Sequence, residues 1–331
     1  MNRILRLVLL RLGVLLYHAG LSRLFIVWHR RVPKVVLYHA CEERESDFIR
    51  GLNSNITPTQ FAQHLDFLLE HYQLIGLAAL EEGRIPERAL VVTFDDGYHS
   101  VYRHAFPLLT ARKIPATVYL VTRTVNNRQL VWVNALNWLL HRHADVCIPL
   151  CQSMLGVPPQ LHSPKQIVDH VQAHYATVPT EQALVAIYSA LAMDPVEHAR
   201  QAELYVTWPQ VQEMSQSGIT FGSHTARHPN LRRLKDHEQH SELQEALRAM
   251  QAVGGRPSLA YPFGEFNADS RQQAIALGHT TVMEVGGLNQ PLDLHAIARV
   301  PVTARSSAEL FAELEIVTPV MAWLKRRLRR D

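Results

Sequence analysis

The sequence predicts an α/β fold in which parallel strands are covered by helices. Short apolar runs rich in β-forming residues alternate with segments of helical patterning, which is typical of a buried parallel sheet. Two helical segments begin with capping signals, and several apolar runs end in charged or polar residues. The chain has 331 residues, of which 47% are hydrophobic and 19% are charged, so it can bury a large core.

Residues 1–34 form a basic and apolar segment with seven Lys and Arg residues and no acid. Its longest stretch without a charge, between Arg11 and Arg23, has eleven residues, whereas a helix that spans a bilayer needs about 20. No small-residue cleavage site follows a continuous apolar region, so a secretory signal is disfavoured. We expect the segment either to lie on a membrane surface or to pack on the domain with its bases in solvent.

Residues 35–315 are predicted to form the main domain. Thr57 and Thr207 are each followed three residues later by Gln, which predicts a capping box at the start of a helix. Gly218 then ends the second helix directly before a strand. The predicted strands are VVLYHA (35–40), LVVTFDD (90–96), ATVYLVT (116–122), ITFGSHT (219–225), SLAYPF (258–263), TTVMEV (280–285) and AIARVPV (296–302).

Between residues 126 and 205 the alternation of strands and helices lapses. This stretch includes VWVNALNWLLHRH and EQALVAIYSALAM, whose patterning predicts a helical insertion. The insertion carries no obvious chemistry, but such a segment beside the ends of strands can shape a substrate groove.

Residues 316–331 predict a basic amphipathic helix. One face holds Val317, Val320, Met321, Leu324 and Leu328, and the other holds Lys325, Arg326, Arg329 and Arg330. The first 34 residues carry a formal charge of +7 and the last 16 carry +4, so the +3 of the whole chain leaves −8 for residues 35–315. An acidic body with basic ends argues against a nucleic-acid-binding surface.

The three cysteines, Cys41, Cys147 and Cys151, contain no CxxC pair. They therefore predict neither a disulfide framework nor a thiolate metal site, and they favour a reducing compartment. Together with the missing secretion signal, this predicts a cytoplasmic location or peripheral attachment to the inner membrane.

Two adjacent carboxylates, Asp95 and Asp96, follow an apolar strand in the segment TFDDGY. Desolvating two such charges side by side is costly, so a buried strand seldom ends in this way without a partner for the charge. Adjacent side chains at a strand end point in different directions, so one carboxylate can bind a cation while the other faces a substrate water. Taken alone, Asp-Asp-Gly is more often a solvated turn.

His224 and His228 lie four residues apart in SHTARH, again after an apolar strand. Two imidazoles at this spacing can reach one metal ion, and with one carboxylate they make a site that leaves positions open for water. The pair alone is a weak signal in a chain with 19 histidines. The two motifs together favour a metal site.

These residues resemble the motifs of the polysaccharide deacetylase family, also called the NodB homology or carbohydrate esterase family 4-like family. TFDDGY is similar to the family's first motif, and SHTARH is similar to its second, which has an H-[ST]-x-x-H core. The resemblance covers roughly residues 35–305 and looks closest to members found with exopolysaccharide synthesis. It implies a distorted (β/α)7 barrel with the site at the carboxyl ends of the strands.

The resemblance also implies roles for the residues of both motifs. Asp95 would be the catalytic base. Asp96, His224 and His228 would bind a divalent metal ion, for which zinc is expected and cobalt, nickel or iron are alternatives.

The family's third motif, R-x-P-[YF], is matched by Ala260-Tyr261-Pro262-Phe263 only in its second half. Tyr261 and Phe263 are then expected at the substrate, with the backbone N–H of Phe263 donating to the oxyanion. Ala260 replaces the arginine that braces the base in the family. Arg299, in the strand ARVPV, is a candidate substitute, and the alternative is a surface arginine on a terminal strand.

The family's last motif supplies a histidine that acts as general acid. Leu292-Asp293-Leu294-His295 does not reproduce its Leu-x-His spacing, so His295 is a weaker candidate. His39, at the end of the first predicted strand, would lie at the same barrel rim as Asp95 and is the preferred one. For either histidine the alternative is a core or supporting role.

The resemblance implies metal-dependent hydrolysis of an N-acetyl group on an amino sugar of a polysaccharide or its precursor, which releases acetate. One alternative is a deformylase or deacetylase of a lipid-linked sugar at the inner membrane face, which the basic ends favour. Another is a non-catalytic carbohydrate-binding member, which the missing motif arginine favours. A metal phosphodiesterase is disfavoured because such sites commonly use two ions and more carboxylates.

Overall fold

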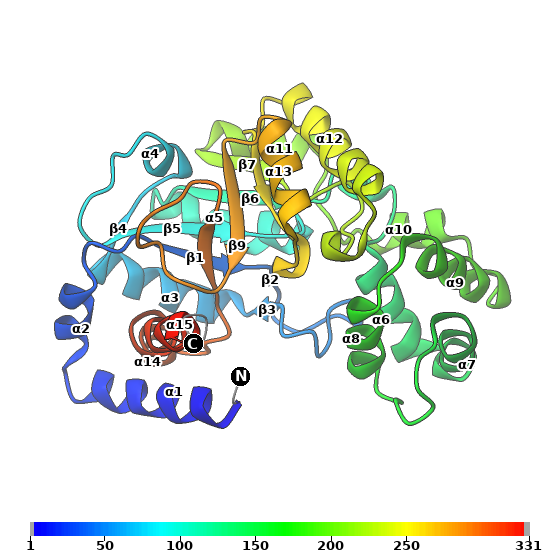
Figure 1. Cartoon of the computed structure of the whole chain (residues 1–331), viewed down its shortest axis with the longest axis horizontal. Coiled ribbons are helices and arrows are strands. Elements are labelled where there is room, and N and C mark those ends of the chain that lie inside the picture. The colour runs from blue at the N-terminus through cyan, green and yellow to red at the C-terminus, as the bar shows by residue number, and fades with distance from the viewer. Residues whose placement is uncertain (1–2, 328–331) are drawn as a thin grey trace.

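Seven parallel strands close into a barrel (Figure 1). The computed structural model describes residues 3–327. Each barrel strand pairs with the next one along the chain, and the last pairs with the first, which closes the ring. The predicted strands are confirmed as β1 (Lys34–Tyr38), β5 (Ala89–Phe94), β6 (Ala116–Leu120), β7 (Ile219–Ser223), β8 (Ser258–Ala260), β9 (Thr281–Val285) and β10 (Ile297–Pro301).

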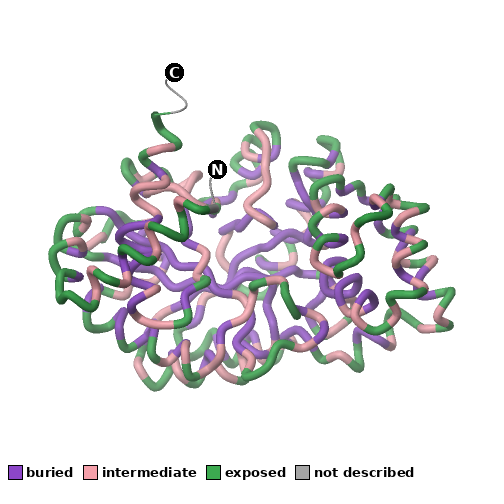
Figure 2. The backbone as a smooth tube through the Cα atoms, turned by 90° about the horizontal axis from the view of Figure 1, so that it is seen from below, coloured by how far each residue is buried: buried purple, intermediate pink, exposed green. Residues whose placement is uncertain are grey.

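The strands are buried on both faces, which explains why their sequences are almost continuously apolar. Alternate positions point to opposite faces of the barrel wall. Val91 belongs to a small inner cluster with Val35 and Met283, whereas its neighbour Val92 joins the large cluster that lies beneath the helices. Figure 2 shows the strands as the buried centre of the molecule.

Helices cover the outside of the barrel. Both predicted capping boxes are present: the hydroxyls of Thr57 and Thr207 accept hydrogen bonds from the backbone N–H of the Gln three residues later. Gly218 follows the second of these helices with a φ of +90°, which glycine adopts without strain. The covering helices are α3 (Pro58–His71), α4 (Leu77–Glu81), α5 (Phe106–Ala111), α11 (Trp208–Gln216), α12 (Asp236–Ala252), α13 (Ala268–Ala276) and α14 (Ser307–Phe311).

Three short strands accompany the barrel. β4 (Gln73–Leu74) pairs in parallel with the start of β5. β2 (Ala40–Cys41) and β3 (Asn55–Ile56) form a separate parallel pair just beyond the carboxyl end of β1. Short helical turns complete the connections, namely η1 (Val101–Ala105), η2 (Val125–Asn127), η3 (Leu231–Arg233) and η4 (Pro262–Gly264).

The stretch predicted as a helical insertion is indeed helical and lies between β6 and β7 along the chain. Its helices gather at one side of the barrel, on the right in Figure 1. Trp132, Leu136 and Ile187 join the same apolar core as the barrel helices, so the insertion is packed onto the domain. It consists of α6 (Trp132–Arg142), α7 (Ala144–Leu155), α8 (Pro164–Ala173), α9 (Thr177–Ala190) and α10 (Pro195–Ala202).

The two ends of the chain lie side by side. α1 (Arg3–His18) and α2 (Ser22–Trp28) precede the barrel, and η5 (Ala312–Val317) and α15 (Thr318–Arg327) follow α14. α1 packs along α14 and η5. The predicted C-terminal helix is present up to Arg327, and the predictions for residues 328–331 lie outside the described residues.

No single helix in residues 3–327 is both long and apolar enough to cross a membrane. The pair Ile4–His18 and Ser22–Trp28 meets the length and composition criteria only when its two helices are taken together, and it is bent by 113°.

Candidate active site

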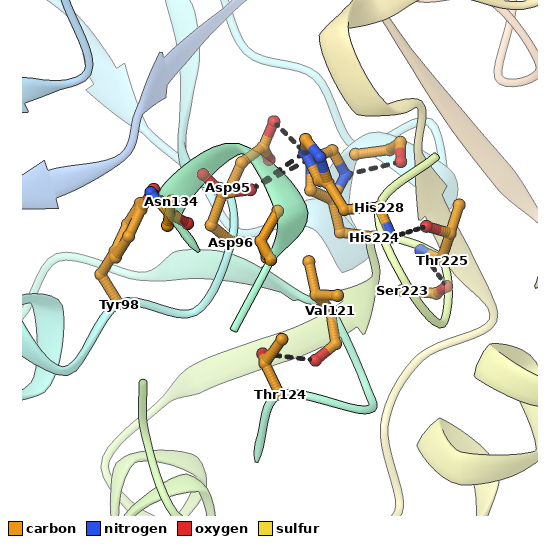
Figure 3. A network of polar contacts seen from close by, with 12 residues as sticks. Asp95, Asp96, Tyr98, Val121, Thr124, Asn134, Ser223, His224, Thr225 and His228 are labelled. Atoms are coloured by element: carbon orange, nitrogen blue, oxygen red, sulfur yellow. Dashed lines mark hydrogen bonds and ion pairs between the residues drawn. The ribbon is translucent and has the colours of Figure 1, made fainter. Parts of the chain in front are cut away.

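The carboxyl ends of the barrel strands bring the predicted metal ligands together. Asp96 follows β5, and His224 and His228 follow β7. Nε2 of His228 is 3.2 Å from Oδ1 of Asp96, and Nε2 of His224 is 3.5 Å from the same oxygen (Figure 3). The three candidate ligand atoms lie within 4.8 Å of one another, so a single ion can contact all of them.

The chemistry of the three side chains fits a divalent metal ion. Oδ1 of Asp96 is buried and has no hydrogen-bond partner among the described residues. Nδ1 of His224 lies 2.7 Å from the carbonyl oxygen of Ala260, to which it can donate, and this tautomer directs the Nε2 lone pair into the site. Burial lowers the pKa of His224 to about 4, so the imidazole is neutral, as metal ligation requires.

Asp95 lies beside the three ligands and is held by Arg299 of β10. The guanidinium donates from Nη1 to Oδ1 at 2.6 Å and from Nη2 to Oδ2 at 2.7 Å. The pair is inside the barrel, and the side chain of Arg299 is 0% exposed. Burial acts to raise the pKa of Asp95, but the charge and hydrogen bonds of Arg299, together with the nearby His224 and His39, outweigh it and hold the pKa below its usual range. Arg299 is therefore placed to orient the carboxylate of Asp95, and the alternative of a surface arginine is wrong.

Four non-glycine residues around the site have left-handed backbone conformations: Asp96 (φ 70°), Thr225 (φ 66°), His228 (φ 63°) and Phe263 (φ 59°). Each such conformation costs on the order of 1–3 kcal/mol and persists only where the surroundings impose it. Gly97 is left-handed too, and a Cβ there would lie 2.6 Å from Cδ2 of Leu120. These turns direct side chains that follow strands into the common pocket.

Hydrogen bonds fix the loop that carries the two histidines. The backbone N–H of His228 donates to the hydroxyl of Thr225 at 3.1 Å, which closes the turn between the two candidate ligands (Figure 3). Glu242 of α12 accepts from the backbone N–H of Arg227 at 2.9 Å, and the indole of Trp132 donates to the carbonyl of His228 at 3.0 Å. The loop is thus held from the barrel helices on one side and from the insertion on the other.

The same pocket contains the other predicted substrate residues. His39, Tyr261 and Phe263 line it together with both aspartates. The ring of Phe263 meets that of His228 edge to face, with 4.6 Å between centroids. The phenolic oxygen of Tyr261 is buried and has no hydrogen-bond partner among the described residues.

His295 does not line this pocket, so its interpretation as a general-acid candidate is wrong. It precedes Ile297, the first residue of β10, whereas the pocket lies at the carboxyl ends of the strands. His295 lies four positions before Arg299, which corresponds to about 13 Å along an extended chain. Its half-buried side chain therefore lies at the wrong end of the strand.

The helical insertion forms part of the pocket wall, as its predicted role in shaping a groove implies, but the residues that it contributes were not predicted from the sequence. α6 contributes Asn134, and α8 contributes Lys165 and Asp169, which form an ion pair at 2.7 Å. The amide of Asn134 donates to the hydroxyl of Tyr98 in TFDDGY at 3.0 Å. A signal was present, because Asn134 is a polar residue within an apolar helical run, and a buried amide needs partners.

Known proteins share both the sequence pattern and the fold. The model of the polysaccharide deacetylase family matches residues 82–282. YxkH of Bacillus subtilis (strain 168) is 19% identical over 287 residues, which cover 84% of this chain and 74% of that protein. The poly-beta-1,6-N-acetyl-D-glucosamine N-deacetylase of Escherichia coli (strain K12) is 44% identical over 96 residues. That stretch covers 27% of this chain but only 14% of the Escherichia coli protein.

Among solved structures, IcaB from Ammonifex degensii superimposes with a TM-score of 0.57 at 21% identity, over 85% of this chain and 96% of IcaB. This likeness shows a shared fold. The family match contains TFDDGY and SHTARH but ends before Arg299, so the arginine that holds Asp95 comes from outside the matched region. Because the family model matches more than half of the sequence, the chain belongs to the polysaccharide deacetylase family.

Proposed function

We propose that the chain hydrolyses the N-acetyl group of an amino-sugar residue in a polysaccharide or its precursor. One observation carries the proposal: Asp95, held by Arg299, lies in the same pocket as a separate group of Asp96, His224 and His228 that can hold a metal ion. Amide hydrolysis needs both a base for the attacking water and an electrophile for the carbonyl. The name of the Escherichia coli relative makes an N-acetylglucosamine polymer the first substrate to test.

Asp96, His224 and His228 would hold the metal ion. One carboxylate and two imidazoles suit zinc first, and they also accept cobalt, nickel or iron. When bound, the ion supplies Lewis acidity to the acetyl carbonyl and to the attacking water.

The residues of the chain would divide the remaining work. Asp95 takes a proton from the water as its oxygen attacks the carbonyl carbon, and Arg299 keeps this carboxylate ionised and oriented. The backbone N–H of Phe263 donates to the oxyanion that develops, while Tyr261 contributes to the wall around the acetyl group. His39 gives a proton to the departing nitrogen as the carbon–nitrogen bond breaks. Acetate and a free amino sugar result.

The test is acetate release from β-1,6-linked N-acetylglucosamine oligomers by the purified full chain. Removal of the metal with a chelator should abolish release, and reloading with zinc should restore it. Asp95→Asn should lower kcat by about 10²–10⁴ while the metal content stays unchanged, because the base is not a ligand. His228→Ala should lower the metal content itself. Retained activity in Asp95→Asn would overturn the assignment of the base.

Two further substrate classes belong in the same assay. A lipid-linked N-acetyl or N-formyl sugar that is hydrolysed in preference to oligomers would move the proposal to the precursor stage. Stoichiometric metal without release from any substrate would instead support a carbohydrate-binding protein.

A further inference from the structure

The outer faces of α1 and α2 expose an unusual number of large apolar side chains. We call this surface the N-terminal apolar face. The chain bends by 113° between the two helices, which lie along the outside of the molecule at one corner of the view in Figure 1. Each of its side chains is between 46% and 84% exposed, and Trp28 is the most exposed of them. The face consists of Leu7, Val8, Leu12, Leu15, Leu24, Val27 and Trp28.

The opposite side of these helices is firmly packed, so the N-terminal apolar face is a fixed surface. Gly13 of α1 lies so close to η5 that a Cβ added there would be 2.4 Å from Cβ of Ala312. The ring of Tyr17 contacts that of Phe311 at 5.9 Å, and Ile26 of α2 is buried in the core. The inner sides of both helices are therefore buried against the domain, while the residues of the N-terminal apolar face remain exposed to solvent.

The charges around the face are predominantly basic. Residues 1–34 contain no acid, and Arg11, Arg23 and Arg31 are exposed on the two helices or just beyond them. Two acids lie at the border: Glu70 is 3.9 Å from Arg23, and Glu87 is 3.0 Å from Arg30 and 4.0 Å from Arg31. These contacts are solvent-exposed, and the bases outnumber the acids, so the surface keeps a net positive charge. The exposed bases Lys325, Arg326 and Arg327 extend the basic surface on α15.

We propose that the N-terminal apolar face docks onto an anionic lipid bilayer, with α1 lying in the headgroup region. A bilayer of this kind accepts apolar side chains at its surface, and its phosphates pair with the basic residues beside the face. Interfacial amphipathic helices bind membranes in this way. A second copy of this chain fits the face less well, because a symmetric contact would place arginine against arginine.

The position of the N-terminal apolar face gives membrane docking a functional role. A pocket lined by Arg6 of α1 and by Met321 and Lys325 of α15 shares two wall residues, Val285 and Pro301, with the catalytic pocket. The side of α1 that carries Arg6 and the site are thus neighbours. Docking holds the site next to a glycan presented at the bilayer, a consequence that depends on the proposed function, although the docking itself does not.

Vesicle flotation of the purified full chain tests the proposal. Wild-type protein should float with vesicles that contain phosphatidylglycerol and much less with phosphatidylcholine alone. The double variant Leu15→Ser, Leu24→Ser should reduce the bound fraction about tenfold or more, since it removes two large apolar side chains from the docking surface. Arg11→Glu should reduce binding to the anionic vesicles selectively.

The matched control is Val178→Ser, Val185→Ser in α9, which removes two similarly exposed apolar side chains far along the chain and should float like the wild type. Acetate release from soluble oligomers should be equal in all variants, which separates loss of docking from loss of the fold or of the proposed activity. Wild-type protein that fails to float with either vesicle would overturn the proposal. So would a concentration-dependent dimer in solution that the leucine variant abolishes, because the face would then be a contact between copies.

Discussion

Next to Asp95, the proposed base, the chain has Ala260 where the motif that the sequence resembles has arginine, and the guanidinium comes from Arg299 on β10 instead. Either position is compatible with the topology, because both strands belong to the same closed ring. β8 and β10 flank β9 in the ring, so a long side chain from either can point inward toward the end of β5. The contact with the ring of Tyr119, 5.4 Å from the guanidinium carbon, holds Arg299 in this direction.

Arg299→Gln should damage both stability and the pH profile. It removes the countercharge of a buried carboxylate, which typically costs about 3–5 kcal/mol of unfolding free energy. It also removes the charge that lowers the pKa of Asp95, so the acid limb of kcat/KM should move to higher pH. Urea denaturation and a pH–rate profile measure the two effects. Arg256→Gln is the control. It breaks the ion pair between Arg256 and Glu81, which lies away from the pocket, and should leave the acid limb of the kcat/KM profile unchanged.

At the scale of residues, the sequence predicts those site residues that belong to short sequence motifs. Asp95 and Asp96 follow one strand and the histidines another, so a shared barrel rim suffices to bring them together. His295 was misplaced because nearness to a strand in sequence does not tell which end of the strand it occupies. Asn134 was missed because its partner Tyr98 is 36 residues away, and only the packed structure reveals the pairing.

At the scale of elements, the sequence predicts the apolar runs that are long enough to form a barrel strand, and it predicts the helices that begin with a threonine cap. β2, β3 and β4 were not, because each has two residues and shows no periodicity. The insertion was recognisable as helical, but its contribution to the pocket wall depends on how its helices pack against the barrel.

The buried His64 in α3 should make the unfolding free energy depend on pH. It is fully buried beside Tyr38, with 3.2 Å between Nδ1 and the phenolic oxygen, and burial lowers its pKa to about 4. The unfolded histidine has a pKa near 6.5, so the unfolded state binds more protons between these values. The unfolding free energy should therefore fall as the pH drops from about 6.5 toward 4, by on the order of 3 kcal/mol from this group.

Urea denaturation at pH 7 and near pH 5 measures this slope. His64→Gln cannot take up the proton and should show a shallower decrease, whereas His237→Gln, on the exposed side of α12, should decrease as steeply as the wild type. An unchanged slope in His64→Gln would show that other groups cause the pH dependence.

At the scale of the whole molecule, a buried charge cluster joins the two ends of the chain. Glu315 of η5 is completely buried and lies 3.3 Å from Nζ of Lys34 in β1 and 2.7 Å from Nδ1 of His29. Tyr72 donates its hydroxyl to the same carboxylate at 2.5 Å. The sequence does not reveal this cluster, because its members are up to 286 residues apart and belong to no motif.

Glu315→Gln should lower the unfolding free energy by about 3–5 kcal/mol, because Lys34 then stays buried without a countercharge. Glu87→Gln is the matched control. It breaks an exposed pair with Arg30 and should cost no more than about 1 kcal/mol. Denaturant unfolding of both variants gives the comparison, and equal losses would mean that the buried cluster contributes little net stability.

The closed ring also has a consequence for biosynthesis. Because β1 takes β10 as a neighbour, the first strand to leave the ribosome must wait for the last before its pairing is complete. Asp95 in particular meets its guanidinium only after 204 further residues have been translated. Until then the carboxylate lacks its countercharge and the sheet has open edges, so we expect the proposed catalytic centre to fold late and the nascent chain to be prone to aggregation.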